Sequence, residues 1–320
     1  MKLSIVIPLL NEQDSLEELF SRIKKICQQY DYSFEVIFVD DGSTDDSWQV
    51  IEYLSKFNPE IRAIRFRKNY GKSQALSAAF AIAKGEVVIT MDADLQDFPE
   101  EIPNLYSMLI NKNADIVSGW KQKRKDPKLT KNLPSKLFNW VARKTSGVEL
   151  HDFNCGLKAY KSEVAKNLEL YGDMHRYIPV LAKNNGYNII LEKQVRHQAR
   201  KYGYSKFGAS RFVNGFLDLI TLSFVSKFGN RPMHIFGLLG TLMFLLGFLF
   251  SMYLGFDKLI KVYIREKPAR LITDNPFFYI SLTTMVLGTQ LFLAAFLGEL
   301  IVRKKTDKTL YSIKDQINVY

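Results

Sequence analysis

The sequence predicts an α/β protein with a mostly parallel sheet, followed by a C-terminal region of two transmembrane helices. Two observations carry this prediction. Strand and helix patterns alternate along residues 1–208, which is typical of a parallel sheet with right-handed crossovers. Two later stretches, 232–256 and 275–298, contain no Asp, Glu, Lys or Arg. Each is long enough to cross a hydrocarbon core of about 30 Å as a helix.

The alternation can be followed element by element, because strands appear as apolar runs and helices as apolar residues at helical spacing. In chain order we expect a strand at 2–7, a helix at 14–29, a strand at 34–39, a helix at 45–57, a strand at 61–67, a helix at 72–84 and a strand at 86–91. Ligands of such sheets bind beyond the carboxyl ends of the strands. Functional residues should therefore follow the strands.

Polar clusters do follow the four predicted strands. They are Pro8–Glu12, Asp40–Asp45, Asn69–Lys72 and Asp92–Asp97. Each cluster alone is typical of an ordinary turn or helix cap. Together they favour one shared cleft, in which Asp40 and Asp41 can accept hydrogen bonds from a base or a ribose.

The cluster at 92–97 has three carboxylates within six residues of a chain whose formal net charge is +11. Like charges this close repel each other, so they need a positive partner or full solvation. Asp92 and Asp94 project to one side if the strand continues, because strand side chains alternate. Two such carboxylates favour Mg²⁺ or Mn²⁺, which takes further ligands from water and substrate phosphates. Asp97 either supports this site or caps the turn before Pro99.

The triplet Gly71–Ser73 is similar to the end of a P-loop. The glycine that a P-loop requires five residues earlier is Phe66, so we reject that motif. Lys72 opens a predicted helix, where its ammonium either faces a phosphate or is solvated. The three histidines His151, His175 and His197 have no metal-ligand spacing, and we expect surface or local hydrogen-bonding roles for them.

The excess of 44 Lys and Arg over 33 Asp and Glu indicates an anionic partner: nucleic acid, membrane headgroups or a phosphorylated substrate. Six basic residues lie among the eleven from Lys121 to Lys131. This run is either an acceptor-phosphate site or a solvated or membrane-surface loop. Nucleic acid is disfavoured by the membrane spans and by the absence of interleaved aromatic residues. Cys27 and Cys155 form no disulfide framework, which fits a reducing compartment.

The membrane region has basic residues before the first span and after the second, so the positive-inside rule predicts that both termini are cytoplasmic. We expect a catalytic domain at 1–208, an interfacial amphipathic helix at 209–231 and a basic tail at 301–320. The alternatives are a core helix for 209–231 and buried helices of a soluble domain for the two spans. Glycines in the spans allow helix association, so a homo-oligomer is possible.

Three of the clusters resemble the motifs of the family 2 inverting nucleotide-sugar glycosyltransferases, which have a Rossmann-like, A-type fold. They are Pro8 with Asn11-Glu12, Asp40–Asp45 and Asp92–Gln96. The resemblance continues through Gly147–Tyr160 and Arg200–Lys206. With two C-terminal spans, the chain is similar over nearly its whole length to the polyisoprenyl-phosphate glycosyltransferases. These include bacterial two-span glucosyl transferases and dolichyl-phosphate mannose synthases.

The resemblance implies transfer of one sugar, with inversion, from a nucleotide sugar to a polyisoprenyl phosphate, aided by Mg²⁺ or Mn²⁺. We expect UDP-glucose and undecaprenyl phosphate at the cytoplasmic face of a bacterial inner membrane, with GDP-mannose and other donors as alternatives. A processive polysaccharide synthase is a second alternative, although no Trp of this chain follows an Arg as in the Gln-x-x-Arg-Trp motif of those enzymes. A non-catalytic membrane scaffold that binds nucleotide or lipid is a third.

The resemblance and the cluster positions together assign roles to individual residues. The donor-binding set is Pro8, Asn11, Glu12, Asp40, Asp41, Lys72 and Asp92. The metal set is Asp92, Asp94 and Gln96. The acceptor-phosphate set is Lys121, Arg124, Arg200, Ser205 and Lys206. Catalytic roles fall to Asp94, Arg124 and Asp152, of which Asp152 either orients the acceptor, accepts a proton or only fixes its loop. Lys121 replaces the first Arg of the family's Gly-x-Arg-x-x-Arg pattern, and lysine is a point charge rather than a fork.

Overall fold

The computed structural model describes residues 1–122, 143, 146–170, 172, 174–198, 201–202, 233–264, 271–303 and 313–318. The chain divides into two compact units. The first contains Met1–Ser226 together with Lys308–Tyr320, and the second contains Lys227–Asp307. The segment 209–231, for which we expect an interfacial helix, lies outside the described residues.

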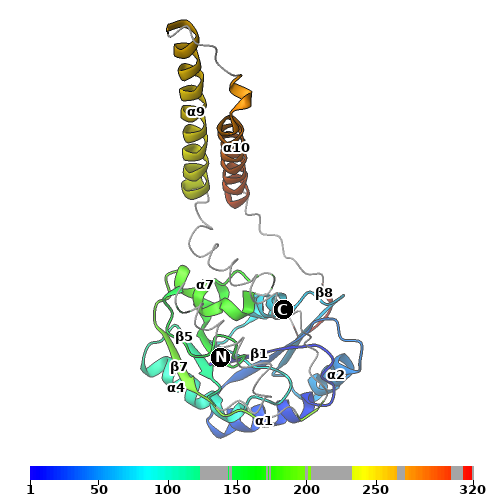
Figure 1. Cartoon of the computed structure of the whole chain (residues 1–320). Helices are drawn as coiled ribbons and strands as arrows, with labels where there is room; N and C mark the ends of the chain where they lie inside the picture. The colour runs from blue at the N-terminus through cyan, green and yellow to red at the C-terminus, as the bar shows by residue number, and fades with distance from the viewer. Residues whose placement is uncertain are drawn as a thin grey trace. The chain divides into compact units, whose positions relative to one another are not determined.

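The described part of the first unit is built on an eight-stranded sheet (Figure 1). Its strands are β1 (Leu3–Leu9), β2 (Phe34–Asp40), β3 (Ile61–Phe66), β4 (Val87–Thr90), β5 (Ile116–Trp120), β6 (Lys158–Lys161), β7 (Ile190–Gln194) and β8 (Ile313–Ile317). The strand order is β7-β5-β6-β4-β1-β2-β3-β8. Neighbouring strands are parallel except where β6 and β8 pair with their neighbours.

The direction of sheet growth reverses at β1, because β2 and β3 lie on one side of it and β4 on the other. Val6 of β1 pairs in parallel with Ile37 of β2 and with Thr90 of β4. The carboxyl ends of these three strands therefore meet at a topological switch point, the place where open α/β sheets bind ligands.

Helices cover both faces of the sheet. On one face lie α1 (Leu16–Gln29), α2 (Ser47–Phe57) and, after the 3₁₀ turn η1 (Pro99–Glu101), α4 (Ile102–Asn111) (Figure 1). On the other lie α3 (Lys72–Ile82), α6 (Ser162–Lys166) and α7 (Ile178–Asn184), with the 3₁₀ turn η2 (Met174–Tyr177) before α7. Burial on both faces explains why five of the seven residues of β2 are apolar. The predicted α/β fold class is confirmed, with strand and helix ends shifted by a few residues.

Strand β8 comes from the C-terminal tail, for which the sequence indicates only basic character. It pairs antiparallel with β3 and covers that edge of the sheet. The Arg62 guanidinium donates to the carbonyl of Asn318 at 3.3 Å, and the Asn318 side-chain amide donates to the carbonyl of Ile61 at 3.1 Å. The strand is hard to predict from sequence because a five-residue edge strand with three polar residues carries little periodic signal.

The second unit contains two long apolar helices. One runs from the π-helical turn η3 (Met233–Gly237) through α9 (Leu238–Leu259) into the π-helical turn η4 (Ile260–Ile264), and the 3₁₀ turn η5 (Ile272–Asp274) precedes the other, α10 (Pro276–Arg303). Their most apolar 18-residue windows are each 17% buried, unlike the core helix of a soluble domain, so both are candidate membrane spans. The helices pack closely: a Cβ added to Gly240 would lie 2.6 Å from the Gly288 carbonyl oxygen.

Candidate active site

The loops that follow β1 and β2 are tied to each other by side chains. The backbone N–H of Asn11 donates to Ser43 Oγ at 2.9 Å, and the N–H of Thr44 donates to Asn11 Oδ1 at 2.7 Å. The N–H of Glu12 donates to Ser47 Oγ at 2.9 Å. Asn11, expected at the donor, therefore uses its side chain to hold the two loops together.

Asp40, the last residue of β2, is fully buried and serves the fold. Its Oδ1 accepts the backbone N–H of Ser43 at 2.7 Å, and its Oδ2 lies 3.4 Å from the Arg65 guanidinium. Among the described residues Oδ2 receives no hydrogen bond, so this carboxylate retains an acceptor beside the Arg65 guanidinium.

Asp41 holds the loop that precedes α3. Its carboxylate accepts the backbone N–H groups of Tyr70 at 2.7 Å and of Gly71 at 2.9 Å. Burial raises the pKa of Asp41 to about 6, although these two donors favour its charged form. Gly42 has φ 78° and no room for a side chain, because a Cβ would lie 2.6 Å from the Lys68 carbonyl carbon. The Asp-Asp-Gly sequence is thus required by the loop itself.

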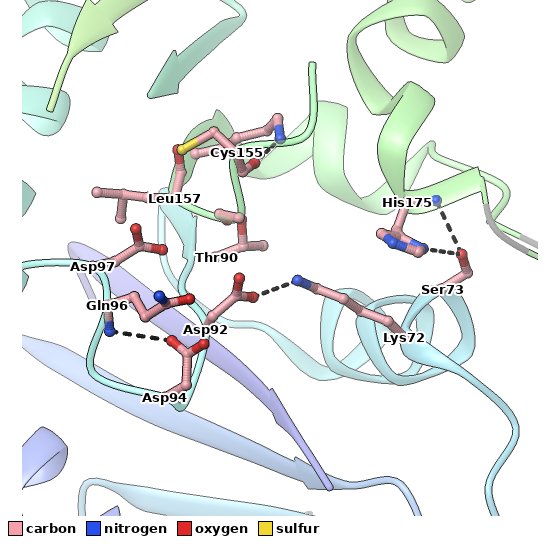
Figure 2. A network of polar contacts seen from close by, with 12 residues as sticks. Lys72, Ser73, Thr90, Asp92, Asp94, Gln96, Asp97, Cys155, Leu157 and His175 are labelled. Atoms are coloured by element: carbon pink, nitrogen blue, oxygen red, sulfur yellow. Dashed lines mark hydrogen bonds and ion pairs between the residues drawn. The ribbon is translucent and has the colours of Figure 1, made fainter. Parts of the chain in front are cut away.

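The acidic turn after β4 does not continue the strand. β4 ends at Thr90, and Leu95 has φ 58°. Alternation of strand side chains therefore does not apply to Asp94, and the turn places its carboxylate instead. Asp94 is 9% exposed, and its Oδ1 accepts the N–H of Gln96 at 3.1 Å. Figure 2 shows Asp92, Asp94 and Gln96 gathered on this turn.

Asp92 has a positive partner in the Lys72 ammonium, which comes from the first residue of α3 (Figure 2). Burial alone would raise the pKa of Asp92, but the positive charges of Lys72, Lys121 and Lys158 hold it well below its ordinary range. The Asp92 side chain is nevertheless 31% exposed. The positive partner that the crowded carboxylates require is thus Lys72 in this structure. Solvent can still reach the Asp92 carboxylate that it pairs with.

Asp97 forms a second, deeper ion pair. Its Oδ1 lies 2.6 Å from the Lys121 ammonium, with the two side chains 0% and 10% exposed. Burial alone would lower the pKa of Lys121, but the Asp97 carboxylate raises it above its ordinary value. Lys121, which we expect at the acceptor phosphate, therefore has its charge bound to Asp97.

The loop before β6 closes over Asp92. The buried Lys158 ammonium donates to the carbonyls of Phe153, at 3.2 Å, and of Cys155. A Cβ added to Gly156 would lie 2.5 Å from Asp92 Oδ2, so only glycine allows this approach. Burial raises the pKa of Cys155 to about 12, which keeps its thiol protonated and excludes a nucleophilic role at neutral pH.

Asp152 is positioned from β7 by Glu192. Glu192 Oε1 accepts the backbone N–H groups of His151 at 2.8 Å and of Asp152 at 3.0 Å, and Oε2 lies 2.7 Å from His151 Nδ1. The His151 ring stacks on Trp120, with centroids 4.3 Å apart. Asp152 is 3% exposed, and its Oδ1 accepts the N–H of Asn154 at 3.1 Å. Sequence patterns gave no signal for Glu192, since its partners lie about forty residues away.

A family model described as Glycosyl transferase family 2 matches residues 4–169, the segment that contains the acidic turn and both donor-side loops. The chain belongs to this family. The enzyme class and family that the sequence motifs indicate are thereby confirmed.

Two curated relatives match this family 2 glycosyltransferase over 95% of its length. The dodecaprenyl-phosphate galacturonate synthase of Rhizobium johnstonii is 34% identical, over 88% of that protein. The undecaprenyl-phosphate 4-deoxy-4-formamido-L-arabinose transferase of Pseudomonas syringae is 34% identical, over 86% of that protein. The glucosyl-3-phosphoglycerate synthase of Mycobacterium tuberculosis, solved with Mn²⁺, UDP-glucose and phosphoglyceric acid, shares the fold. Its TM-score is 0.55 at 18% identity, over 70% of this chain and 79% of that one.

The glycosyltransferase fits a divalent metal at the acidic turn. The described residues include no group of three or more His, Cys, Asp or Glu side chains that could hold a metal ion. Asp92 and Asp94 supply two carboxylates and Gln96 an amide oxygen. This partial oxygen set suits Mg²⁺ or Mn²⁺ when water and substrate phosphates complete the coordination. The ion pair with Lys72 shows that Asp92 attracts a cation.

The structure describes only some of the remaining predicted site residues. Pro8 lies in β1 opposite Val39 of β2, at the carboxyl edge of the sheet. Four members of the predicted acceptor-phosphate set lie outside the described residues: Arg124, Arg200, Ser205 and Lys206.

The structure also brings η2 to the site, which sequence analysis did not anticipate. His175 and Arg176 of η2 line a pocket together with Lys72 and Asp92. We expect a surface or local hydrogen-bonding role for His175, but its hydrogen bond is to Ser73, 102 residues away in sequence (Figure 2). Its place beside Asp92 follows from packing of η2 on α3, about 100 residues away in sequence, so periodicity holds no trace of it.

Proposed function

We propose that this glycosyltransferase transfers a single sugar from a nucleotide sugar to a polyprenyl phosphate at a membrane surface. The observation that carries the proposal is the acidic turn at the switch point of the sheet, where the Lys72 ammonium pairs with Asp92. Two relatives with 95% coverage of the chain are named for transfer to prenyl phosphates. The two candidate membrane spans fit a lipid acceptor.

UDP-glucose is the donor that we propose first, with undecaprenyl phosphate as the acceptor. The relatives are named for galacturonate and 4-deoxy-4-formamido-L-arabinose, so their nucleotide-linked forms are the competing donors. GDP-mannose is a further competing donor, because the chain also resembles the dolichyl-phosphate mannose synthases.

In the proposed reaction, a phosphate oxygen of the acceptor attacks the anomeric carbon from the face opposite the diphosphate. The new C–O bond forms as the bond to the diphosphate breaks, which inverts the configuration. Asp92, Asp94 and Gln96 would hold a metal ion, which when bound neutralises charge on the leaving diphosphate. Lys72 would then turn its ammonium from Asp92 towards the diphosphate. The acceptor phosphate is already anionic, so Asp152 need only orient it rather than act as a strong base.

The acceptor phosphate would be bound by the basic residues after β5 and before the first span. Because Lys121 is paired with Asp97, we assign this role chiefly to Arg124, Arg200 and Lys206. Arg124→Ala should raise the KM for the lipid more than the KM for the donor. An unchanged response to the lipid would remove Arg124 from the acceptor site. By the positive-inside rule, we place both termini and the catalytic unit in the cytoplasm of a bacterium, at its inner membrane.

The test is to incubate membranes that contain the full chain with labelled nucleotide sugars, undecaprenyl phosphate and Mn²⁺ or Mg²⁺. One labelled sugar per lipid phosphate supports the proposal. A growing polymer would indicate a processive synthase instead. Nucleotide binding without transfer from any donor would indicate a non-catalytic scaffold.

A further inference from the structure

A small pocket lies beside Asp92 and remains unused in the reaction described above. It is lined by charged and polar residues that include Lys72, Asp92, Asn154, Lys158, His175 and Arg176. Its volume is about 20 Å³. That is room for a single water-sized group and excludes a whole sugar ring.

One wall of the pocket carries a hydrogen-bond donor, the His175 ring. Ser73 Oγ accepts the backbone N–H of His175 at 3.0 Å and lies 3.2 Å from Nδ1. Among the described residues Ser73 Oγ has no other acceptor, so its proton is directed at Nδ1, and the ring proton of neutral His175 is carried by Nε2. Burial and the charges of Lys72 and Arg176 keep the pKa of His175 well below its ordinary range, so the ring is neutral.

The same pocket carries a hydrogen-bond acceptor. Asn154 Oδ1 is buried, and no described residue donates to it. Its loop is held in place by Lys158 at the carbonyls of Phe153 and Cys155 and by the bond from the Asn154 N–H to Asp152. A buried, rigidly held acceptor that no described residue satisfies costs stability unless another group binds to it.

We propose that this pocket binds one hydroxyl group of the donor sugar, whose oxygen accepts from His175 Nε2 and whose proton goes to Asn154 Oδ1. The inference rests on the proposed function and adds the residues that recognise the donor sugar. A hydroxyl is both donor and acceptor, whereas a phosphate oxygen would only accept and would leave Asn154 Oδ1 facing an anion. The pocket adjoins Asp92, so a sugar whose diphosphate is held at the acidic turn can reach it.

The consequence is discrimination among donors. A sugar that lacks this hydroxyl, or presents it in the other configuration, leaves the buried Asn154 Oδ1 and the His175 ring N–H unpaired. Sites built in this way reject such analogues far more strongly than apolar pockets reject a missing methylene.

The experiment compares each nucleoside diphosphate with its sugar derivative by calorimetric titration of the purified full chain with Mn²⁺. The pairs are UDP with UDP-glucose and UDP-galacturonate, and GDP with GDP-mannose. His175→Phe and Asn154→Leu should each weaken binding of the sugar nucleotide by about 10-fold to 100-fold. Binding of the bare diphosphate should stay within about twofold, which also shows that the variants are folded.

Two further variants separate recognition from a purely structural role. The double variant should lose no more affinity for the sugar nucleotide than the worse single variant, because both side chains bind one group. His175→Gln, which retains a neutral N–H donor, should recover part of the lost affinity.

Three results would overturn the inference. If binding of the bare diphosphate is weakened equally, His175 and Asn154 bind the diphosphate or support the fold instead. Unchanged sugar-nucleotide binding in both variants would make the pocket a water site. If the wild-type chain binds none of the sugar nucleotides, the proposed function fails as well, and that outcome is visible before any variant is compared.

Discussion

The two sides of the switch point use their carboxylates differently. On the β2 side, Asp40 and Asp41 are buried and accept backbone N–H bonds that shape the loops. On the β4 side, Asp92 and Asp97 are paired with lysines. The Asp92 side chain is 31% exposed, whereas Asp97 is fully buried. The buried acids on the β2 side build the fold, whereas the partly exposed Asp92, held by a flexible lysine, can exchange that partner for a substrate-borne cation.

The acidic turn should give the largest effect on activity. Asp92→Asn and Asp94→Asn should each lower transfer by about 10³-fold, because the charge that holds the metal is lost. Melting temperature should hardly change. The measurement is labelled-sugar transfer. The matched control is Asp14→Asn, because Asp14 is an exposed acid in the loop before α1. Near-normal activity of Asp94→Asn would refute its metal role.

Gly156→Ala should follow, with a loss of about 10²-fold, because the new Cβ displaces the Asp92 carboxylate or the loop over it. The same change at Gly255, where nothing lies within 4 Å, should have little effect. Both variants are compared in the transfer assay at equal amounts of folded protein. If Gly156→Ala is as active as Gly255→Ala, the loop does not position Asp92.

Glu192→Gln tests the support beneath Asp152. A neutral amide accepts the two backbone N–H groups more weakly than a carboxylate, and it meets His151 Nδ1 with an N–H donor in place of an acceptor oxygen. We expect about a tenfold loss of transfer, expressed in the KM for the lipid phosphate rather than for the donor. Glu149→Gln, the same change at an exposed position, is the control. An equal rise in both KM values would mean that Glu192 supports the whole site and not Asp152 in particular.

The smallest effect should come from pH at Asp41. Its pKa is raised from an ordinary value of 3.8 to about 6 in the folded chain, so the folded state binds more protons between these values. The wild-type chain should therefore lose stability relative to Asp41→Asn as pH rises from 4 to 7, by about 3 kcal/mol at most. Melting temperatures of both proteins across this range measure the difference. A difference that does not change with pH would show that burial of Asp41 is not costly.

Local patterns were sufficient for much of the fold. The alternation of apolar runs located β1 to β4 and α1 to α3 to within a few residues, and the charge-free stretches located both long apolar helices. The short motifs after the strands were enough to indicate the family that the comparison with known proteins confirms. These features repeat or terminate within a few residues, so the sequence alone determines them.

The contacts that shape the site were decided by tertiary structure. Lys72 reaches Asp92 across 20 residues, Lys121 reaches Asp97, Glu192 reaches Asp152 across 40 residues, and Ser73 reaches His175 across 102. The unbalanced charge of the acidic turn is visible in the sequence, whereas its partner is not. The physical reason is that periodicity is a property of neighbours along the chain. The sheet order brings together strand ends that are far apart in sequence. The contacts made at those strand ends determine which acid is fixed in the fold and which can exchange its cation.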